Sequence, residues 1–180
     1  VMPLFISSDH HTLLLQLYRL AHVLPVDQFQ DSSLELIKQV LPFDASMWGS
    51  ATTSTHGIDI HMLHLHQKSP EMLQAYEPLK QHDTAAASMF GQEQATRGFH
   101  AESWFAAPQQ REFFATLRRF GQENFFITSQ HNSNTQFAEW ITLFRADADA
   151  HCTPEEVAIL SQLAPHVMQA QAFNRVTHLT

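Results

Sequence analysis

The sequence predicts an α+β domain in which antiparallel strands are layered with helices. Two observations favour this class: the strands come in neighbouring pairs joined by short polar turns, and helices precede, separate and follow those pairs. Strands joined by a short turn are antiparallel, whereas a strict alternation of strands and helices would indicate a parallel sheet. The length of 180 residues and the composition, 44% apolar and 16% charged, predict one globular domain spanning residues 1–180.

Two amphipathic helices begin the chain. After Ser7–Asp9, apolar residues recur with helical spacing until Pro25 stops the helix: Leu13, Leu14, Leu17, Leu20, Ala21 and Leu24. The same spacing predicts a second helix, which should end before Pro42: Leu34, Leu36, Ile37, Val40 and Leu41.

Strand patterns follow in two hairpins and one short segment. The first hairpin should turn at Thr55–Gly57 and the second around Asn132–Asn134, because both turns are short and rich in residues that favour turns. The expected strands are Ala45–Thr53, Ile58–Gln67, Gly98–Ala101, Phe125–Gln130 and Phe137–Arg145.

Prolines and capping residues mark the helices between the strands. Pro70 suits the first turn of a helix that carries Met72 and Tyr76, and Pro78 should end or kink that helix. Asp83 or Thr84 is expected to cap a further short helix.

Two more helices complete the pattern. Pro108 opens one whose apolar face is mostly aromatic and which Gly121 caps: Phe113, Phe114, Leu117 and Phe120. The run Thr153–Glu156 is a capping box with proline at the first helical position, so a long closing helix should begin there. Pro165 lies inside this helix and is expected to bend it.

Charge argues against direct nucleic-acid binding. The chain carries 10 Lys and Arg against 18 Asp and Glu, a formal net charge of −8. A duplex-binding surface needs clustered positive charge to displace counterions, and this sequence has no cluster of Lys and Arg residues.

The chain has the features of a cytoplasmic protein without a membrane partner. No apolar run approaches the about 20 residues of a membrane span. Val1–Pro3 lacks the basic start of a signal peptide, and Val1 before Met2 suggests a cloning remnant. The single cysteine, Cys152, excludes an internal disulfide and a multi-thiolate metal site.

Tyr76 and Asp83 are the sharpest candidates for ligand binding. A buried tyrosine hydroxyl normally needs a partner, and a nearby carboxylate accepts hydrogen bonds from an amide or hydroxyl of a ligand. The alternative is that Asp83 only caps a helix and Tyr76 only packs by its ring. Large aromatics are usually core residues, but Trp48, Trp104 and Trp140 are also candidates to line a ligand cavity.

Thirteen histidines offer a second kind of site. Strand alternation should place Ile60, Met62, His64 and His66 on one face of their strand. Two imidazoles at positions i and i+2 can chelate a metal, and one could ligate haem, although no convincing third ligand is evident. The simpler interpretation is that these residues line a cavity or face water.

Catalysis has little support. The chain lacks the hydrolase, zinc-protease, phosphate-loop and dinucleotide-binding motifs. Cys152 precedes a helix start, which could lower its pKa, but no base accompanies it. We therefore expect a binding module and no enzyme.

Several segments resemble the sensor domains of LuxR-type transcriptional regulators. They are Phe43–Gly49, Leu63–His66 running into Pro70–Tyr76, Asp83, Arg119–Gly121, and the tail Leu163–Ala170 with Asn174 and Arg175. The resemblance is to GAF-like sensors and, more distantly, to autoinducer-binding domains. It implies an α-β-α sandwich of GAF/PAS type, with a central antiparallel sheet of about five strands and helices on both faces.

The resemblance also implies site residues. Tyr76 and Asp83 match two positions that hold acyl-homoserine lactones in autoinducer-binding domains. Met72 and His100 fall where those domains have tryptophans, so a different small-molecule ligand is expected. The ligand would lie beneath the segment from Met72 to His100.

The partners that the resemblance implies are a small-molecule ligand and a second copy of the chain, which would pair through the terminal helices. No cofactor is expected. DNA would be bound only through a helix-turn-helix domain after Arg175, which is absent from this chain. Two alternatives remain: a haem or metal sensor using His64, His66 or His100, and a module that dimerises without a ligand.

Overall fold

The computed structural model describes residues 8–179, so the expected remnant Val1–Pro3 lies outside the described residues. The chain divides into two compact units. The sheet unit is Phe43–Val157, and the helical unit is Val1–Pro42 together with Ala158–Thr180. Each unit is described by itself.

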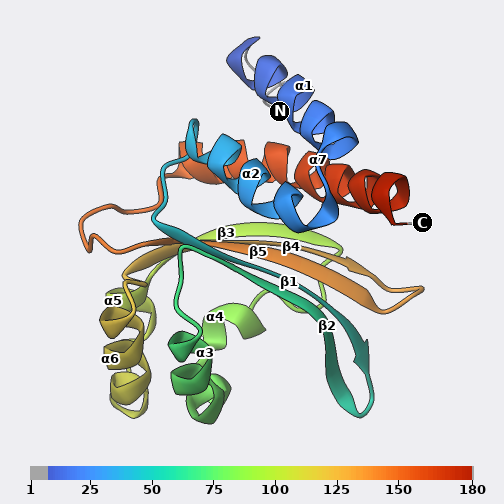
Figure 1. Ribbon diagram of the computed structural model, residues 1–180. Helices are drawn as coiled ribbons and strands as arrows, with labels where there is room; N and C mark the ends of the chain where they lie inside the picture. The colour runs from blue at the N-terminus through green and yellow to red at the C-terminus, as the bar shows by residue number, and fades with distance from the viewer. Residues whose placement is uncertain (1–7, 180) are drawn as a thin grey trace. The chain divides into compact units, whose positions relative to one another are not determined.

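The sheet unit is built on one five-stranded antiparallel sheet, drawn in Figure 1. Its strand order is β2-β1-β5-β4-β3, and every neighbouring pair is antiparallel. The strands are β1 (Ala45–Ser54), β2 (Gly57–His66), β3 (Gln94–His100), β4 (Asn124–Asn132) and β5 (Phe137–Arg145). Both predicted hairpins and the α+β class are confirmed. The third strand begins four positions earlier than predicted, because Gln94–Arg97 lacks an apolar alternation that would reveal it.

The two faces of this sheet follow from its register. Residues opposite each other in an antiparallel pair point to the same face, and successive residues alternate. Ala45 is opposite Phe144, and Gly49 is opposite Trp140. We call the face that carries these residues the cluster face, and the other the reverse face.

Helices of the sheet unit lie on one side of the sheet, below it in Figure 1. They are α3 (Glu71–Tyr76), the 3-10 helix η1 (Glu77–His82), α4 (Thr84–Ala87), α5 (Ala101–Trp104), the 3-10 helix η2 (Pro108–Gln110) and α6 (Arg111–Arg119). The predicted interruption at Pro78 is confirmed, because the α-helix gives way to η1 at Glu77.

A buried aromatic cluster joins these helices to the cluster face. Its members come from the strands and from α4, α5 and α6: Ala45, Ala85, Met89, Phe99, Ala101, Phe105, Phe113, Leu117, Phe125, Ile127 and Phe144. Tyr76, Met47 and Leu79 are among the partly buried residues packed against it. Burial of this much apolar surface is the main force holding the short helices to the sheet.

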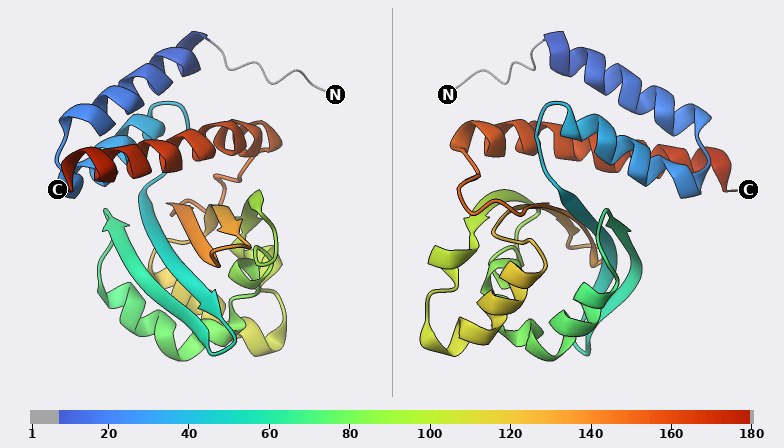
Figure 2. Two further views of the ribbon diagram at one scale, coloured as in Figure 1. Left: turned by 90° about the vertical axis from the view of Figure 1, so that its right-hand side faces the viewer. Right: turned by 60° about the vertical axis from the view of Figure 1, so that its left-hand side comes forward.

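The helical unit contains α1 (Ser8–Val23), α2 (Val26–Lys38) and α7 (Pro154–His178) except its first turn, and the three helices lie together in both views of Figure 2. Asn174 on α7 is 1% exposed, and its side-chain amide donates to the carbonyl oxygens of Ala21 (2.9 Å) and Leu24 (2.8 Å) at the end of α1. The Tyr18 hydroxyl and His166 Nδ1 are 3.0 Å apart. α7 continues through Pro165. None of the described helices combines the length and apolarity needed to cross a bilayer.

Candidate functional site

Tyr76 and Asp83 are brought together by the short helices below the sheet. The Tyr76 hydroxyl donates a hydrogen bond of 2.7 Å to Asp83 Oδ2. Tyr76 ends α3 and Asp83 precedes α4, so η1 turns the chain between them. Asp83 Oδ1 accepts from the backbone N–H of Ala86 at 3.0 Å, which makes Asp83 the N-cap of α4. One carboxylate therefore fixes a helix start and orients a phenol.

Burial controls the ionisation of this pair. Burial raises the pKa of Asp83, while hydrogen bonds from the Ala86 amide and the Tyr76 hydroxyl oppose that shift. Burial, and then the charge of Asp83, raise the pKa of Tyr76, so the phenol is neutral at physiological pH. A carboxylate accepts about four hydrogen bonds through its two oxygens, and the protein approaches it here with the Tyr76 hydroxyl and the backbone amides of Ala86 and Ala85. Asp83 keeps capacity for a donor from a ligand.

The Tyr76 ring joins the pair to the aromatic cluster. The Tyr76 ring packs against Phe113, with ring centroids 6.0 Å apart, and Phe113 contacts Phe105 edge-on at 4.9 Å. Phe99 stacks on Phe125 with centroids 5.2 Å apart. Polar groups on such an apolar background are typical of a site that binds a small molecule by a few oriented contacts.

Trp104 lies beside this pair and is 37% exposed. Its indole N–H donates to Thr84 Oγ1 at 2.9 Å, directly after Asp83 in the chain, and its ring meets Phe99 edge-on. The Gln110 amide donates to the His82 carbonyl at 3.2 Å. These bonds tie α5 and η2 to the start of α4, so three of the predicted residues (Tyr76, Asp83 and Trp104) form one constellation.

Met72 lies one turn before Tyr76 on α3 and is 4% exposed. Residues four apart share a helix face, so Met72 and Tyr76 point the same way. The resemblance implies a tryptophan at this position, but the chain has Met72, whose side chain is a flexible thioether.

Trp140 also lies on the cluster face, opposite Gly49. A β-carbon at Gly49 would overlap the Trp140 ring, so the glycine allows the indole to lie against the backbone of β1. On the other side Trp140 is opposite Ser129 of β4. The Ser129 hydroxyl is buried and has no hydrogen-bond partner among the described residues. Sequence reasoning missed Ser129, although alternation from Phe125 and Ile127 places it on this face.

The register separates four other predicted residues from Tyr76 and Asp83. Trp48 is opposite His64, Ser46 is opposite His66 and Ser50 is opposite Met62. Trp48, Met62, His64 and His66 therefore lie on the reverse face, since Trp48 alternates with Gly49. Trp48 is fully buried, and its indole donates to Glu139 Oε2 at 2.7 Å. A register shift places Ile60 opposite Ala51, so Ile60 does not continue the alternation of the other three.

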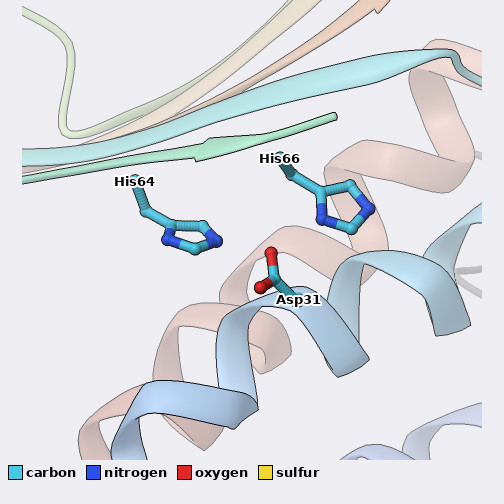
Figure 3. A group of neighbouring side chains, drawn as sticks. All are labelled: Asp31, His64 and His66. Atoms are coloured by element: carbon cyan, nitrogen blue, oxygen red, sulfur yellow. The ribbon is translucent and has the colours of Figure 1, made fainter. Parts of the chain in front are cut away.

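His64 and His66 project from β2 to the same side, as Figure 3 shows. The predicted spacing thus places two imidazoles on one face, and His66 is 4% exposed. Asp31, also drawn in Figure 3, belongs to α2 of the helical unit, and we assign it no part in a site of the sheet unit. The metal or haem alternative remains a hypothesis.

His100 ends β3 on the reverse face, opposite Asn124. His100 Nδ1 and Asn124 Oδ1 are 2.8 Å apart, and the His100 ring packs against His151 in a tilted arrangement with centroids 4.3 Å apart. The Asn124 amide donates in turn to the carbonyls of Asp147 (3.0 Å) and Ala148 (3.1 Å). His100 thus belongs to a polar network at the end of the sheet, away from the Tyr76–Asp83 constellation.

Cys152 does not have the lowered pKa that its place before a helix suggested. Burial raises the pKa of this thiol to about 11, although the Arg145 charge acts in the opposite direction. Its side chain lies against Gly98, where a β-carbon would overlap it. A thiol with this pKa is a poor nucleophile at neutral pH.

Comparison with known proteins gives matches by structure alone. No protein-family model matches the sequence, and no curated protein does. A crystal structure of CepR2, an N-acylhomoserine lactone-dependent LuxR family transcription factor from Burkholderia cenocepacia, matches with a TM-score of 0.69 and 15% identity. The match covers 97% of this chain and 100% of that one. The chain has the fold of LuxR-family sensor domains.

Two further structures match the same fold. SdiA in complex with octanoyl-rac-glycerol matches with a TM-score of 0.66 and 10% identity, over 98% of this chain and 72% of that one. The phycoerythrobilin-bound GAF domain of a cyanobacterial phytochrome matches with a TM-score of 0.59 and 8% identity, over 97% and 100% of the two chains. The predicted resemblance to autoinducer-binding and GAF domains is confirmed at the level of fold.

Proposed function

We propose that this chain is a small-molecule-sensing and dimerising regulatory domain of a LuxR-type transcriptional regulator, acting in the cytoplasm. The observation that carries the proposal is the Tyr76–Asp83 pair, half-buried beside the aromatic cluster. A neutral phenol and a carboxylate with spare acceptor capacity can orient a ligand whose apolar part contacts the rings. This arrangement is suited to bind and position a molecule.

Two of the matched structures support this ligand chemistry. CepR2 is described as dependent on N-acylhomoserine lactone, and the SdiA structure is a complex with octanoyl-rac-glycerol, an acyl chain on a polyol. For this chain we propose a ligand with an apolar body and an N–H or O–H group that donates to Asp83. Met72 in place of an indole favours a ligand other than an acyl-homoserine lactone.

Ligand binding would act through the short helices. Asp83 caps α4, and Thr84 accepts the hydrogen bond from Trp104, so a ligand bound at Asp83 stabilises the junction of α3, α4 and α5. Helices of four to six residues have little stability of their own, and a ligand can order them. The ligand shifts the equilibrium only by its differential affinity for the ordered and open states.

Dimerisation is proposed to use the helical unit. This unit exposes large apolar side chains: Leu15 (74% exposed), Val23 (58%), Phe173 (43%), Val176 (81%) and, just after α7, Leu179 (64%). An exposed apolar surface of this kind favours association with a second copy. Val176→Asp should convert a dimer to monomer in analytical ultracentrifugation, whereas Thr177→Asp next to it, the matched control, should not. A monomeric unsubstituted chain would contradict this part of the proposal.

A thermal-shift and calorimetry screen tests ligand sensing. Acyl, aromatic and indole-like compounds should include one class that raises the melting temperature of the protein, and Asp83→Asn should abolish that shift. Asparagine still caps a helix, so this substitution removes the charge with little effect on folding. Asp59→Asn, an acid-to-amide change at an exposed position of β2, is the control. The proposal fails if no class stabilises the protein.

The haem or metal sensor remains a second candidate because His64 and His66 share one face of β2. It predicts a coloured or metal-containing protein after purification, and a colourless, metal-free preparation ends it. A module that only dimerises predicts that Tyr76→Phe and Asp83→Asn leave every regulatory response unchanged.

A further inference from the structure

Lys68 places a cation beside the aromatic cluster. It follows β2 after Gln67, whose φ of 56° lies in the left-handed region that a side-chain-bearing residue rarely adopts. Lys68 Nζ donates to the carbonyl oxygen of Phe120, directly after α6, at 3.0 Å, and lies 4.4 Å from the centroid of the Phe144 ring. The left-handed turn and both contacts hold a half-buried ammonium group at this place.

Lys68 has no acidic partner in the part of the chain that the structure describes. Burial lowers the pKa of its amine to about 8, and no carboxylate contributes to that shift. An ammonium group has three donors, and the Phe120 carbonyl uses one. A desolvated cation without an anion is unfavourable, and a carbonyl dipole and a ring face compensate it only in part. An anion beside Lys68 would accept its remaining hydrogen bonds and neutralise its charge.

The aromatic cluster thus carries polar groups at two separate places. Phe144, under Lys68, contacts Phe125 in the cluster with centroids 6.2 Å apart. Tyr76 contacts the cluster at Phe113 in the first turn of α6, whereas Lys68 is bonded to Phe120 after its last turn. Phe113 and Phe120 are seven positions apart along α6 and its C-cap, which corresponds to a rise of about 10 Å. An extended chain of about eight to ten atoms spans a distance of this order.

We propose that Lys68 binds the carboxylate of the ligand, so that the sensor takes an amphipathic acid whose other end donates a hydrogen bond to Asp83. The inference rests on the proposed function and deepens it by naming the ligand class. The ligand has an anionic head at Lys68, an apolar body along the aromatic cluster, and a hydroxyl or amide at the Tyr76–Asp83 pair.

Isothermal titration calorimetry with ω-hydroxydecanoate, decanediol and decanoate tests this inference. Decanediol keeps the hydroxyl without the charge, and decanoate keeps the charge without the hydroxyl. The protein should bind ω-hydroxydecanoate about tenfold or more tightly than decanediol, the range expected of a charge-assisted hydrogen bond. Lys68→Met, which keeps the aliphatic stem, should remove that difference. Lys80→Met, at an exposed lysine, should retain it.

The pH dependence gives a second readout. Affinity for ω-hydroxydecanoate should fall as the pH rises above about 8, where the free amine loses its proton, while affinity for decanediol should not. Lys68→Arg keeps its charge at this pH and should flatten the dependence.

The outcomes separate the two proposals. Equal binding of ω-hydroxydecanoate and decanediol, both lost in Asp83→Asn, overturns the role of Lys68 and leaves ligand sensing intact. The same holds if Lys68→Met binds both probes as the unsubstituted protein does while its melting temperature is unchanged. Failure of all three probes to bind counts against the acid ligand, and the wider screen then decides whether the sensor function fails as well.

Discussion

The two faces of the sheet use polar side chains in different ways. On the reverse face, several polar groups pair with each other across strands, as Trp48 does with Glu139, Thr96 with Thr128 and His100 with Asn124, although the Ser46 hydroxyl there is buried without a partner among the described residues. On the cluster side, strands contribute mainly aromatic rings, Tyr76 and Asp83 come from the helical segments, and the Ser129 hydroxyl likewise lacks a partner among the described residues. Paired polar groups stabilise a fold, whereas groups with spare capacity are available to a ligand.

Removing a reverse-face indole should give the largest loss of stability. Trp48→Ala deletes a fully buried ring and should lower the free energy of unfolding by about 3–5 kcal/mol. Chemical denaturation measures this loss. Trp104→Ala is the matched change on the cluster side and should cost much less, because that indole is 37% exposed. Equal losses for the two variants would contradict the division of roles between the faces.

The contributions of Glu156 and Asp83 to the free energy of unfolding should change with pH in opposite directions. Hydrogen bonding and charge from Arg145, which is 7% exposed, lower the pKa of Glu156. The stability contributed by this pair is present above the unfolded pKa of Glu156, about 4.3, and is lost as the pH falls through the lower folded pKa. Glu156→Gln should therefore cost roughly 3 kcal/mol at neutral pH and little in acid.

Asp83 has the reverse sign because burial raises its pKa in the folded state. Its contribution to stability falls as the pH rises from the unfolded pKa, about 3.9, through the higher folded value. Asp83→Asn should thus gain stability relative to the unsubstituted protein as the pH increases through this window. Urea denaturation at several pH values measures both slopes, and slopes of the same sign would refute the distinction.

Adding a single methyl group at Gly49 probes how tightly the cluster face is filled. In Gly49→Ala the new β-carbon overlaps the Trp140 ring, so we expect a loss of about 1–3 kcal/mol and a changed tryptophan fluorescence spectrum. Gly57→Ala is a useful contrast, since no atom lies near that position and only its φ of +126° opposes the change. An unchanged spectrum in Gly49→Ala would show that Trp140 moves freely.

The smallest effect is expected at Ser129. Its hydroxyl is buried without a partner among the described residues, so Ser129→Ala should change the free energy of unfolding by less than about 1 kcal/mol, and in the stabilising direction. A large destabilisation in thermal denaturation would mean that the hydroxyl has a structural partner. It would contradict the claim that Ser129 on the cluster face has unused hydrogen-bonding capacity.

Local sequence patterns predicted the elements whose signals are local. The turn residues revealed both hairpins, and the capping box is present as expected: Thr153 Oγ1 accepts from the Glu156 amide, and Glu156 Oε1 accepts from the Thr153 amide, both at 3.1 Å. Asp83 caps α4, as one of the two predicted candidates, because its side chain reaches the Ala86 amide. Tyr76 and Asp83 were predicted as ligand-binding candidates from their chemistry and from the resemblance, and the structure joins them by a hydrogen bond.

The pairing of strands that are distant in the sequence decides on which face of the sheet a side chain lies, and local sequence patterns do not reveal it. Trp48, Met62, His64 and His66 were predicted as candidates to line a cavity, and only the register of β1 with β2 and β5 shows that they lie on the reverse face. Ser129 and Lys68 have no local pattern that distinguishes them from ordinary polar residues. Their importance comes from burial and from partners more than fifty positions away, as with Lys68 and Phe120.

Asn174 couples the two terminal helices mechanically. Each of its buried hydrogen bonds to the end of α1 would cost about 1–3 kcal/mol to leave unmade, so separation of α1 from α7 at this point is rare. Rotation of α7 about its axis would break both bonds unless the end of α1 moved with it.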